Sequence, residues 1–362
     1  VYIPKGNYLC TPIFLKSDIS IWIDKGARII GVKDREMYPI LPGMTESSDG
    51  KDEYNLGSWE GNPLSIFASL ITGINVKNVE IFGEGVIDAA ATMDDWWREH
   101  KIKNIAWRPN MIFLYKCKNI TMQGLTLTNS PSWTIHPYYS DDLYFLNNSI
   151  INPENSPNTD GLDPESCENV LILGIDISVG DDCIAIKSGK YYMACKHYKA
   201  TKNILIRNCI FKKGHGSVTV GSEIASGVFN VKVEKCIFIG TDRGLRIKTR
   251  RGRGEKSVLT DIVFKNIYMK DVSMPFTANM FYFCDPDGHS DYVQNQDKME
   301  VDKRTPRIGK IVASNIKCEN VKNVLACFYG LPEMPIEEIK LSDIIADFDM
   351  EENIRPTVPI MM

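Results

Sequence analysis

The chain has 362 residues, of which 43% are hydrophobic and 24% charged, so it can bury a large core as an ordinary globular protein does. Its 46 acidic and 42 basic residues give a net charge of -4, which carries no global signal for nucleic acid or an anionic membrane. No apolar run reaches the roughly 18 residues expected of a membrane span.

The two ends of the chain suggest a cut protein. It begins at Val1 in a strand-like run without a signal-peptide pattern, and it ends abruptly at Pro359–Met362. We expect one domain over residues 1–362 that is truncated at both ends. The compartment (extracellular, periplasmic or cytoplasmic) and the oligomeric state stay open.

A short strand pattern recurs along the chain. Asn or Asp is followed by apolar residues at the next, third and eighth positions, and Gly or Asn usually stands at the fifth, where a sharp turn tolerates positive φ. From the second copy onward the copies lie 23 to 34 residues apart. They begin at Asn78, Asn119, Asp142, Asn169, Asn203, Asn230 and Asp261.

This spacing favours an all-β solenoid, the parallel β-helix. Propeller blades need about 40 residues, and leucine-rich repeats need a strict leucine frame that is absent. A large antiparallel β-sandwich is the alternative. We expect residues 93–105, which contain Trp96 and Trp97, to form a helix or loop inserted into one coil. Cys209 and Cys236 stand where other copies have Leu or Ile, which predicts buried thiols, and the absence of a CxxC pair argues against zinc.

The densest chemistry lies in four motifs about one repeat apart. Asn-Thr-Asp-Gly contains Asp160, Gly-Asp-Asp-Cys contains Asp181 and Asp182, Gly-His-Gly contains His215, and Arg-Ile-Lys contains Arg246 and Lys248. Residues one coil apart stack at about 4.8 Å on a β-helix. The four motifs should therefore line one groove with an acidic part and a cationic part.

Stacked carboxylates suit acid–base catalysis, because their repulsion raises at least one pKa and can keep a proton on it. Glycoside hydrolysis needs a protonated acid beside an ionised carboxylate. Arg246 and Lys248 alternate with Ile247, so both should point outward toward an acidic sugar. Taken singly, each motif has another interpretation: a turn aspartate, a calcium ligand pair or solvated turn, a loop histidine, or the solvent face of a strand.

At these motifs the chain resembles the polygalacturonase family, glycoside hydrolase family 28, over most of its length. The resemblance implies a right-handed parallel β-helix that hydrolyses α-1,4 galacturonan with inversion and without a metal or cofactor. It implies that Asp181 is the general acid, that Asp160 and Asp182 activate water, and that His215 tunes the proton on Asp181. Arg246 and Lys248 would bind a galacturonate carboxylate, with Asn158 in the same cleft.

Further positions resemble bacterial members of the family. Two of them concern the substrate: His136 either reaches the sugar or is a satisfied structural histidine, and Tyr282 corresponds to a substrate-contacting tyrosine. Secreted fungal relatives often have a disulfide at the positions of Cys183 and Cys209, although the spacing here differs slightly. The seven basic residues within 243–256 are interpreted as attracting a polyanionic substrate rather than nucleic acid, since base-stacking aromatic residues are absent.

Three other functions are alternatives to galacturonan hydrolysis. A pectate lyase would need calcium and an arginine base, and a non-catalytic polysaccharide-binding β-helix would have no use for three stacked acids beside a histidine. A rhamnogalacturonan hydrolase is the alternative within the family. We favour exo action, with the insertion around Trp96-Trp97 and residues 285–307 as candidate walls of the groove. The expected partner is an acidic polysaccharide, without nucleic acid or membrane.

Overall fold

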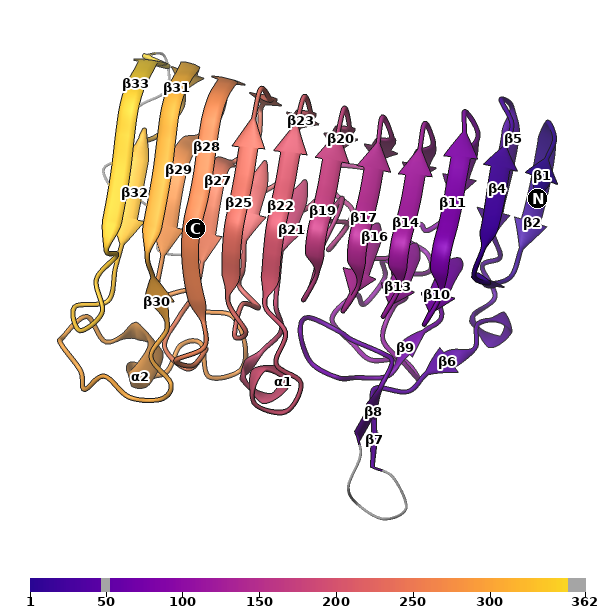
Figure 1. Cartoon of the computed structure of the whole chain (residues 1–362), viewed down its shortest axis with the longest axis horizontal. Coiled ribbons are helices and arrows are strands. Elements are labelled where there is room, and N and C mark those ends of the chain that lie inside the picture. The colour runs from indigo at the N-terminus through magenta and orange to yellow at the C-terminus, as the bar shows by residue number, and fades with distance from the viewer. Residues whose placement is uncertain (47–52, 351–362) are drawn as a thin grey trace.

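A computed structural model describes residues 1–46 and 53–350, so the Pro359–Met362 end lies outside the described residues. The chain winds into a solenoid whose strands stack in parallel (Figure 1). The predicted right-handed parallel β-helix is confirmed. Within the described residues, no helix is both long and apolar enough to cross a bilayer.

Three parallel ladders build the walls of the solenoid. The first ladder is β1 (Tyr2–Ile3), β4 (Ile19–Ile23), β11 (Lys77–Gly83), β14 (Lys118–Gln123), β17 (Asp141–Leu146), β19 (Glu168–Leu173), β22 (Thr201–Arg207), β25 (Val228–Glu234), β28 (Val258–Lys270), β31 (Lys310–Val321) and β33 (Glu338–Phe348). The second is β2 (Gly6–Cys10), β5 (Ala27–Gly31), β12 (Val86–Asp88), β15 (Thr126–Thr128), β18 (Ser149–Ile151), β20 (Asp176–Ser178), β23 (Ile210–Lys212) and β26 (Ile237–Ile239), continued by the ends of β28 and β31.

The third ladder carries the functional residues and has two stretches. One stretch is β3 (Ile13–Phe14), β10 (Ile71–Ile74), β13 (Ile112–Tyr115) and β16 (Ile135–Tyr138). The other is β21 (Ile184–Ile186), β24 (Val218–Val220), β27 (Arg243–Lys248), β29 (Met274–Asn279) and β32 (Ala326–Tyr329). Leu162 joins them, because it bridges both Ile135 and Ile184.

Short elements decorate the loops at one edge of the solenoid. They are the antiparallel pairs β6 (Ile40–Leu41) with β9 (Ile66–Phe67) and β7 (Met44–Glu46) with β8 (Glu53–Asn55), and the helices η1 (Arg35–Met37), α1 (Tyr191–Lys196) and α2 (Asp291–Gln294). Most of these lie on the lower side of Figure 1. The short strand β30 (Arg307–Ile308) instead extends the first ladder, since it pairs in parallel with the start of β28.

The core is a set of apolar columns inside the coils. In one column every side chain is fully buried, and each burial contributes about 1.5–3 kcal/mol; its members in register are Ile81, Met122, Phe145, Ile172, Ile206, Val233 and Phe264. The predicted buried thiols are confirmed, since Cys209 and Cys236 are free and buried. Cys183 and Cys209 are both free thiols, so they do not form the disulfide found in fungal relatives.

The repeat residues also make the turns. The glycine or asparagine predicted at the fifth position has positive φ in each copy, for example 78° at Gly124 and 55° at Asn208. The first residue of each copy has positive φ as well. Where this residue is asparagine, its side-chain amide donates to the counterpart one coil earlier. Asn203, for example, donates to Asn169 at 3.0 Å, and Asn230 donates to Asn203 at 2.8 Å. The marker asparagines therefore link neighbouring coils.

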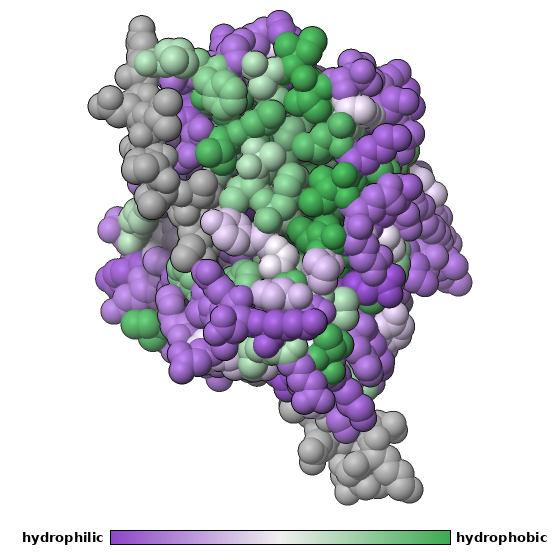
Figure 2. Space-filling model, turned by 90° about the vertical axis from the view of Figure 1, so that its left-hand side faces the viewer, coloured by the Kyte–Doolittle hydropathy of each residue, from purple (hydrophilic) through white to green (hydrophobic). Residues whose placement is uncertain are grey.

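The C-terminal end of the solenoid is apolar. Figure 2 looks onto this end, where hydrophobic side chains gather beside polar flanks. β33 contributes Ile339, Leu341, Ile345 and Phe348, all partly exposed.

Residues 93–105 form a series of turns without a helix. Trp96 and Trp97 point inward, with 0% and 6% exposure, and Trp96 contacts Tyr38 and Phe67 edge-on. The two tryptophans are the small core of this loop, while Lys101 of the same insertion lines the cavity described below.

Candidate active site

The predicted stacking of the acidic motifs is present in the structure. Leu162, Ile184 and Val218 are in register, which places Asp160 beside Asp182 one coil on. The Gly161 N–H donates to the Asp182 carbonyl at 3.0 Å, and the His215 N–H donates to the Asp181 carbonyl at 3.1 Å. The coil period therefore brings together Asp160, Asp181, Asp182 and His215.

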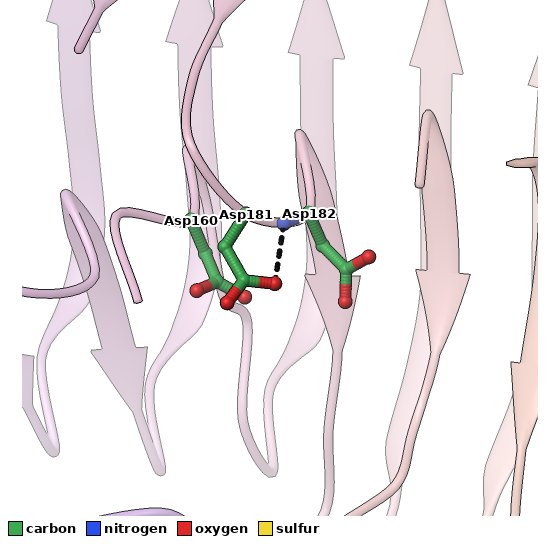
Figure 3. A group of neighbouring side chains, drawn as sticks. All are labelled: Asp160, Asp181 and Asp182. Carbon is green, nitrogen blue, oxygen red and sulfur yellow. Dashed lines mark hydrogen bonds between the residues drawn. The ribbon is translucent and has the colours of Figure 1, made fainter. Parts of the chain in front are cut away.

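The carboxyl groups of Asp160, Asp181 and Asp182 lie close together. One oxygen from each of Asp160, Asp181 and Asp182 lies within 4.8 Å of the others. In Figure 3 the carboxyls of Asp160 and Asp181 lie side by side, and that of Asp182 turns away from them. Asp181 Oδ1 accepts the Asp182 N–H at 2.9 Å, which fixes the first of the paired aspartates.

Asp182 turns toward two cations. Its Oδ1 accepts a hydrogen bond from Arg246 Nη1 at 3.0 Å, and its Oδ2 accepts one from Lys248 Nζ at 2.8 Å. Burial alone would raise the pKa of Asp182, but Lys248 and Arg246 outweigh it and hold that pKa well below its usual range. Asp182 is therefore ionised throughout the ordinary pH range.

Gly-His-Gly makes this contact possible. A Cβ at Gly216 would lie 2.7 Å from Asp182 Oδ1 and 3.3 Å from Arg246 Cδ, so only glycine leaves Arg246 a path across the intervening coil. The sequence predicts that Arg246 and Lys248 contact the substrate, but it does not predict their ion pairs with Asp182. The sequence does contain a signal for it: the coil register places Gly216 between Asp182 and Arg246.

Asp160 has the opposite environment. It is 3% exposed, and its Oδ1 has no hydrogen-bond partner within the part of the chain that the structure describes. Burial, followed by the charge of Asp181, raises its pKa well above the usual value. The pKa values of two aspartates in neighbouring coils are thus shifted in opposite directions, a division that acid–base chemistry can use.

His215 is half exposed and lies beside Asp181. Its Nδ1 contacts Asp242 Oδ2 at 2.8 Å, a partner that the sequence analysis missed. This hydrogen bond raises the pKa of His215, and the charge of Asp181 adds to the effect. His215 and Asp181 both line a hollow of about 340 Å³, together with Asn158 and Lys101.

A larger cavity of about 460 Å³ holds the carboxyls. Its lining includes the predicted Asn158, Asp160, Asp181, Asp182, Lys248 and Tyr282. The ring of Tyr282 lies 5.4 Å from Lys248 Nζ. Arg108, which the sequence analysis did not identify, donates from Nη2 to Asn158 Oδ1 at 2.7 Å and fixes this amide at the rim.

The cavity extends beyond the predicted residues. Lys187, in register with Lys248 through Gly221, donates from Nζ to Glu223 at 3.1 Å and lies 4.4 Å from the Trp133 ring centre. Burial alone would lower the pKa of Lys187, but Glu223 and then Asp163 raise it, so the amine stays charged. The shared register with Lys248 was the signal that could have identified it.

His136 does not line the cavity, and its predicted contact with the sugar is wrong for this structure. The ring is fully buried, with Nε2 at 2.8 Å from Glu165 and Nδ1 at 3.1 Å from Asn110. Its alternation on β16 places it among packed aromatic rings, where a carboxylate satisfies its polar edge. It is the satisfied structural histidine.

The basic run after Arg246 also differs from the prediction. Arg250, Arg251 and Arg253 are at most 4% exposed, and acids of the following loops neutralise them. Arg251 forms a two-pronged ion pair with Glu333, at 2.6 and 3.0 Å. These three arginines hold loops together, so they are not available to attract a polyanion.

The carboxylate trio also has the composition of a cation site. A metal ion there would have to share Asp182 with Arg246 and Lys248, which already take both of its oxygens. The local positive charge therefore favours proton chemistry over a divalent cation.

Comparison with known proteins decides the family. The model for "Glycosyl hydrolases family 28" matches residues 25–301. The chain belongs to this family. A probable polygalacturonase of Vitis vinifera is 31% identical over 95% of this chain and 66% of its own length, and an endo-polygalacturonase of Pectobacterium carotovorum subsp. carotovorum is 33% identical over 76% and 65%. The chain thus spans slightly under two thirds of each relative.

Solved structures of family 28 enzymes have the same fold. A hyperthermoactive exopolygalacturonase from Thermotoga maritima superposes with a TM-score of 0.79 at 26% identity, over 95% of this chain and 78% of that one. The polygalacturonase of Erwinia carotovora ssp. carotovora gives 0.73 at 25% identity, over 95% and 84%.

Proposed function

We propose that this family 28 protein hydrolyses α-1,4-linked galacturonate in pectin or polygalacturonate. The observation that carries the proposal is the trio of carboxyls in one cavity, with Asp160 inclined to hold a proton and Asp182 kept ionised by two cations. The names of the relatives, among them endo- and exopolygalacturonases, support the same substrate class. An acidic polysaccharide is the partner that these cations suit.

The roles follow from position. Asp181, the acid of the trio with partial exposure, gives its proton to the glycosidic oxygen as the bond to the anomeric carbon breaks. Water attacks that carbon from the other face and passes its proton to ionised Asp182, while Asp160 holds the water. His215, whose pKa is raised by its hydrogen bond to Asp242, returns a proton toward Asp181 for the next cycle. Inversion at the anomeric carbon is part of this proposal.

Arg246 and Lys248 then have two tasks. They keep Asp182 ionised, and they present donors to a galacturonate carboxylate that enters the cavity. Tyr282 and Asn158 line the same space and would contact the sugar.

We further propose exo action. Loops close one side of the cavity: Glu60 comes from the turn at residues 59–62, and Asp285 and His289 come from residues 285–307, the second candidate wall. Lys190 contacts both loops, through a hydrogen bond to the Gly61 carbonyl at 3.2 Å and an ion pair with Asp285 at 2.6 Å. A closed groove admits a chain end better than the middle of a polymer.

Product analysis on polygalacturonic acid tests both statements. Exo hydrolysis should release one small saturated product from the first time point, and NMR of that product should reveal an inverted anomer. A ladder of oligomers would contradict exo action. Products with ultraviolet absorbance from a new double bond would point to a lyase and overturn the proposed hydrolysis.

A further inference from the structure

A tight turn inserted before β9 reaches into the cavity. Trp59 and Asn62 pair across it, with N–H to carbonyl distances of 2.9 Å and 3.0 Å in the two directions. The two residues at its tip, Glu60 and Gly61, have φ of 46° and 72°. Two successive positive φ values define the compact hairpin tip that holds its side chains in one direction. Glu60 is therefore presented by a rigid turn.

The tip is seated on the coil that carries the site. The Lys190 N–H donates to the Gly61 carbonyl at 3.2 Å. A Cβ at Gly61 would lie 2.7 Å from Glu223 Cγ, so glycine is needed for so close an approach. This contact fixes the depth to which the tip enters, and Glu60 lines the same cavity as the catalytic carboxyls.

The base of the turn is tied to the site from the other side. Trp59 stacks on Trp107 with ring centres 5.0 Å apart and planes 8° from parallel. The guanidinium of Arg108 covers Trp59 at 5.3 Å and donates to Asn158 at 2.7 Å. The position of Glu60 relative to the cavity is thus set by packing at both ends of the turn.

Within the described residues, the two lysines whose charges act on Glu60 are paired with other carboxylates. Burial, followed by the charge of Glu223, raises the pKa of Glu60, while Lys190 and Lys187 oppose this shift. Lys187 is paired with Glu223 at 3.1 Å, and Lys190 is paired with Asp285 at 2.6 Å. Asp285 also takes Arg253 at 3.0 Å. The closed side of the cavity therefore offers carboxylate oxygens, which accept hydrogen bonds from hydroxyls and repel the carboxylates of galacturonate.

We propose that Glu60 recognises the non-reducing end of the substrate by accepting a hydrogen bond from its terminal 4-hydroxyl. In every internal residue of an α-1,4 chain that oxygen carries the next sugar and has no proton to donate. The reducing end exposes a hemiacetal of two anomers, which a rigid acceptor matches less well. This inference rests on the proposed function and adds to it the group that distinguishes a chain end.

The test compares two trisaccharides. One is saturated trigalacturonate, and the other is its unsaturated counterpart made with a pectate lyase, whose terminal residue has a double bond at C4 and no 4-hydroxyl. The wild-type chain should hydrolyse the saturated substrate with a kcat/KM about 10- to 100-fold higher, as expected when a buried hydrogen-bonding group is left without its partner. In Glu60→Ala the two values should become equal within a factor of about 3.

The outcomes distinguish the role of Glu60 from the proposed hydrolysis of galacturonate. Equal wild-type rates on both substrates, or a preference that survives in Glu60→Ala, would overturn the role of Glu60 and leave hydrolysis standing. Cleavage of neither substrate would overturn the proposed function, and this inference with it. The wild-type comparison decides even where a variant folds poorly, and Glu60→Gln, with a neutral acceptor of the same size, should keep an intermediate preference.

A matched control removes a carboxylate elsewhere. Glu84 is exposed and pairs with Lys25, at 3.3 Å, at the turn between β11 and β12. Glu84→Gln should retain both the wild-type activity and the full preference for the saturated substrate. A loss of preference in this control would mean that net charge, rather than the contact made by Glu60, sets the selectivity.

Discussion

Two groups of basic residues lie only a few positions apart on the chain, and each forms a cluster with acids in different surroundings. In the reactive cluster, Arg246 and Lys248 on β27 contact Asp182, and Asp182 and Lys248 line the cavity. In the anchor cluster, the arginines 250, 251 and 253 meet acids of the loops that follow. Both clusters are buried, so burial by itself does not separate them.

The difference is which other groups share the space. The reactive cluster has Asp160 and Asp181 beside it, with an open cavity in front. Arg251 instead donates hydrogen bonds to Glu333 and to the carbonyls of Tyr292 and Asn295, which surround its guanidinium. An ion pair can take part in chemistry only where a polar group and a vacant volume remain beside it.

The largest effect is expected in the reactive cluster. Asp181→Asn should lower kcat on polygalacturonate by about 10³-fold or more, because the amide cannot protonate the leaving oxygen. The melting temperature should stay near that of the wild type, since this side chain is partly exposed. Reducing-sugar release and circular dichroism measure the two quantities. Near-normal turnover would contradict the assignment of the acid.

Arg251→Ala probes the anchor cluster. Leaving Glu333 buried without its partner should cost about 3–5 kcal/mol of unfolding free energy. The kcat of the remaining folded protein should change little, because Arg251 does not line the cavity. Denaturant unfolding measures the cost. As a control, Arg251→Met combined with Glu333→Leu removes both charges and should cost less; an equal cost would contradict the ion-pair explanation.

Arg246→Ala should lower kcat/KM about 100-fold, because the substrate carboxylate and Asp182 both lose a cation. It should also shift the pH profile. Asp182 acts as a base only while ionised, and Arg246 helps to hold its pKa low. Loss of Arg246 raises that pKa, so activity should fail at a higher pH on the acid side. An unmoved acid limb of kcat/KM against pH would contradict the coupling.

Arg246→Lys gives the matched control, since it keeps the charge and loses the planar fork. It should restore the acid limb and recover only part of the affinity.

The smallest effect concerns stability and Asp160. Its folded pKa lies above the unfolded value, so its favourable contribution is complete below the unfolded pKa and is lost as pH rises through the folded pKa. Asp160→Asn removes this cost of ionisation. The melting temperature should therefore rise by a few degrees near pH 7, and by less near pH 4, while activity is lost. A lower melting temperature at pH 7 would contradict the raised pKa.

The sequence by itself determined the solenoid and the members of the carboxylate trio. Strand alternation and a marker asparagine in each copy gave the coils, because every coil must repeat the same inward pattern to extend one core. The coil period then placed Asp160, Asp182 and His215 in neighbouring turns. These are consequences of local pattern and spacing, which a sequence records directly.

Only the tertiary structure decided how the ionised side chains pair. Whether Arg246 contacts Asp182, and Arg251 contacts Glu333, depends on side-chain reach across coils and loops that no periodicity encodes. The same holds for His136, buried against Glu165, and for the Trp59–Asn62 turn that carries Glu60 into the cavity. Insertions follow no repeat, so their contacts are fixed by packing in three dimensions.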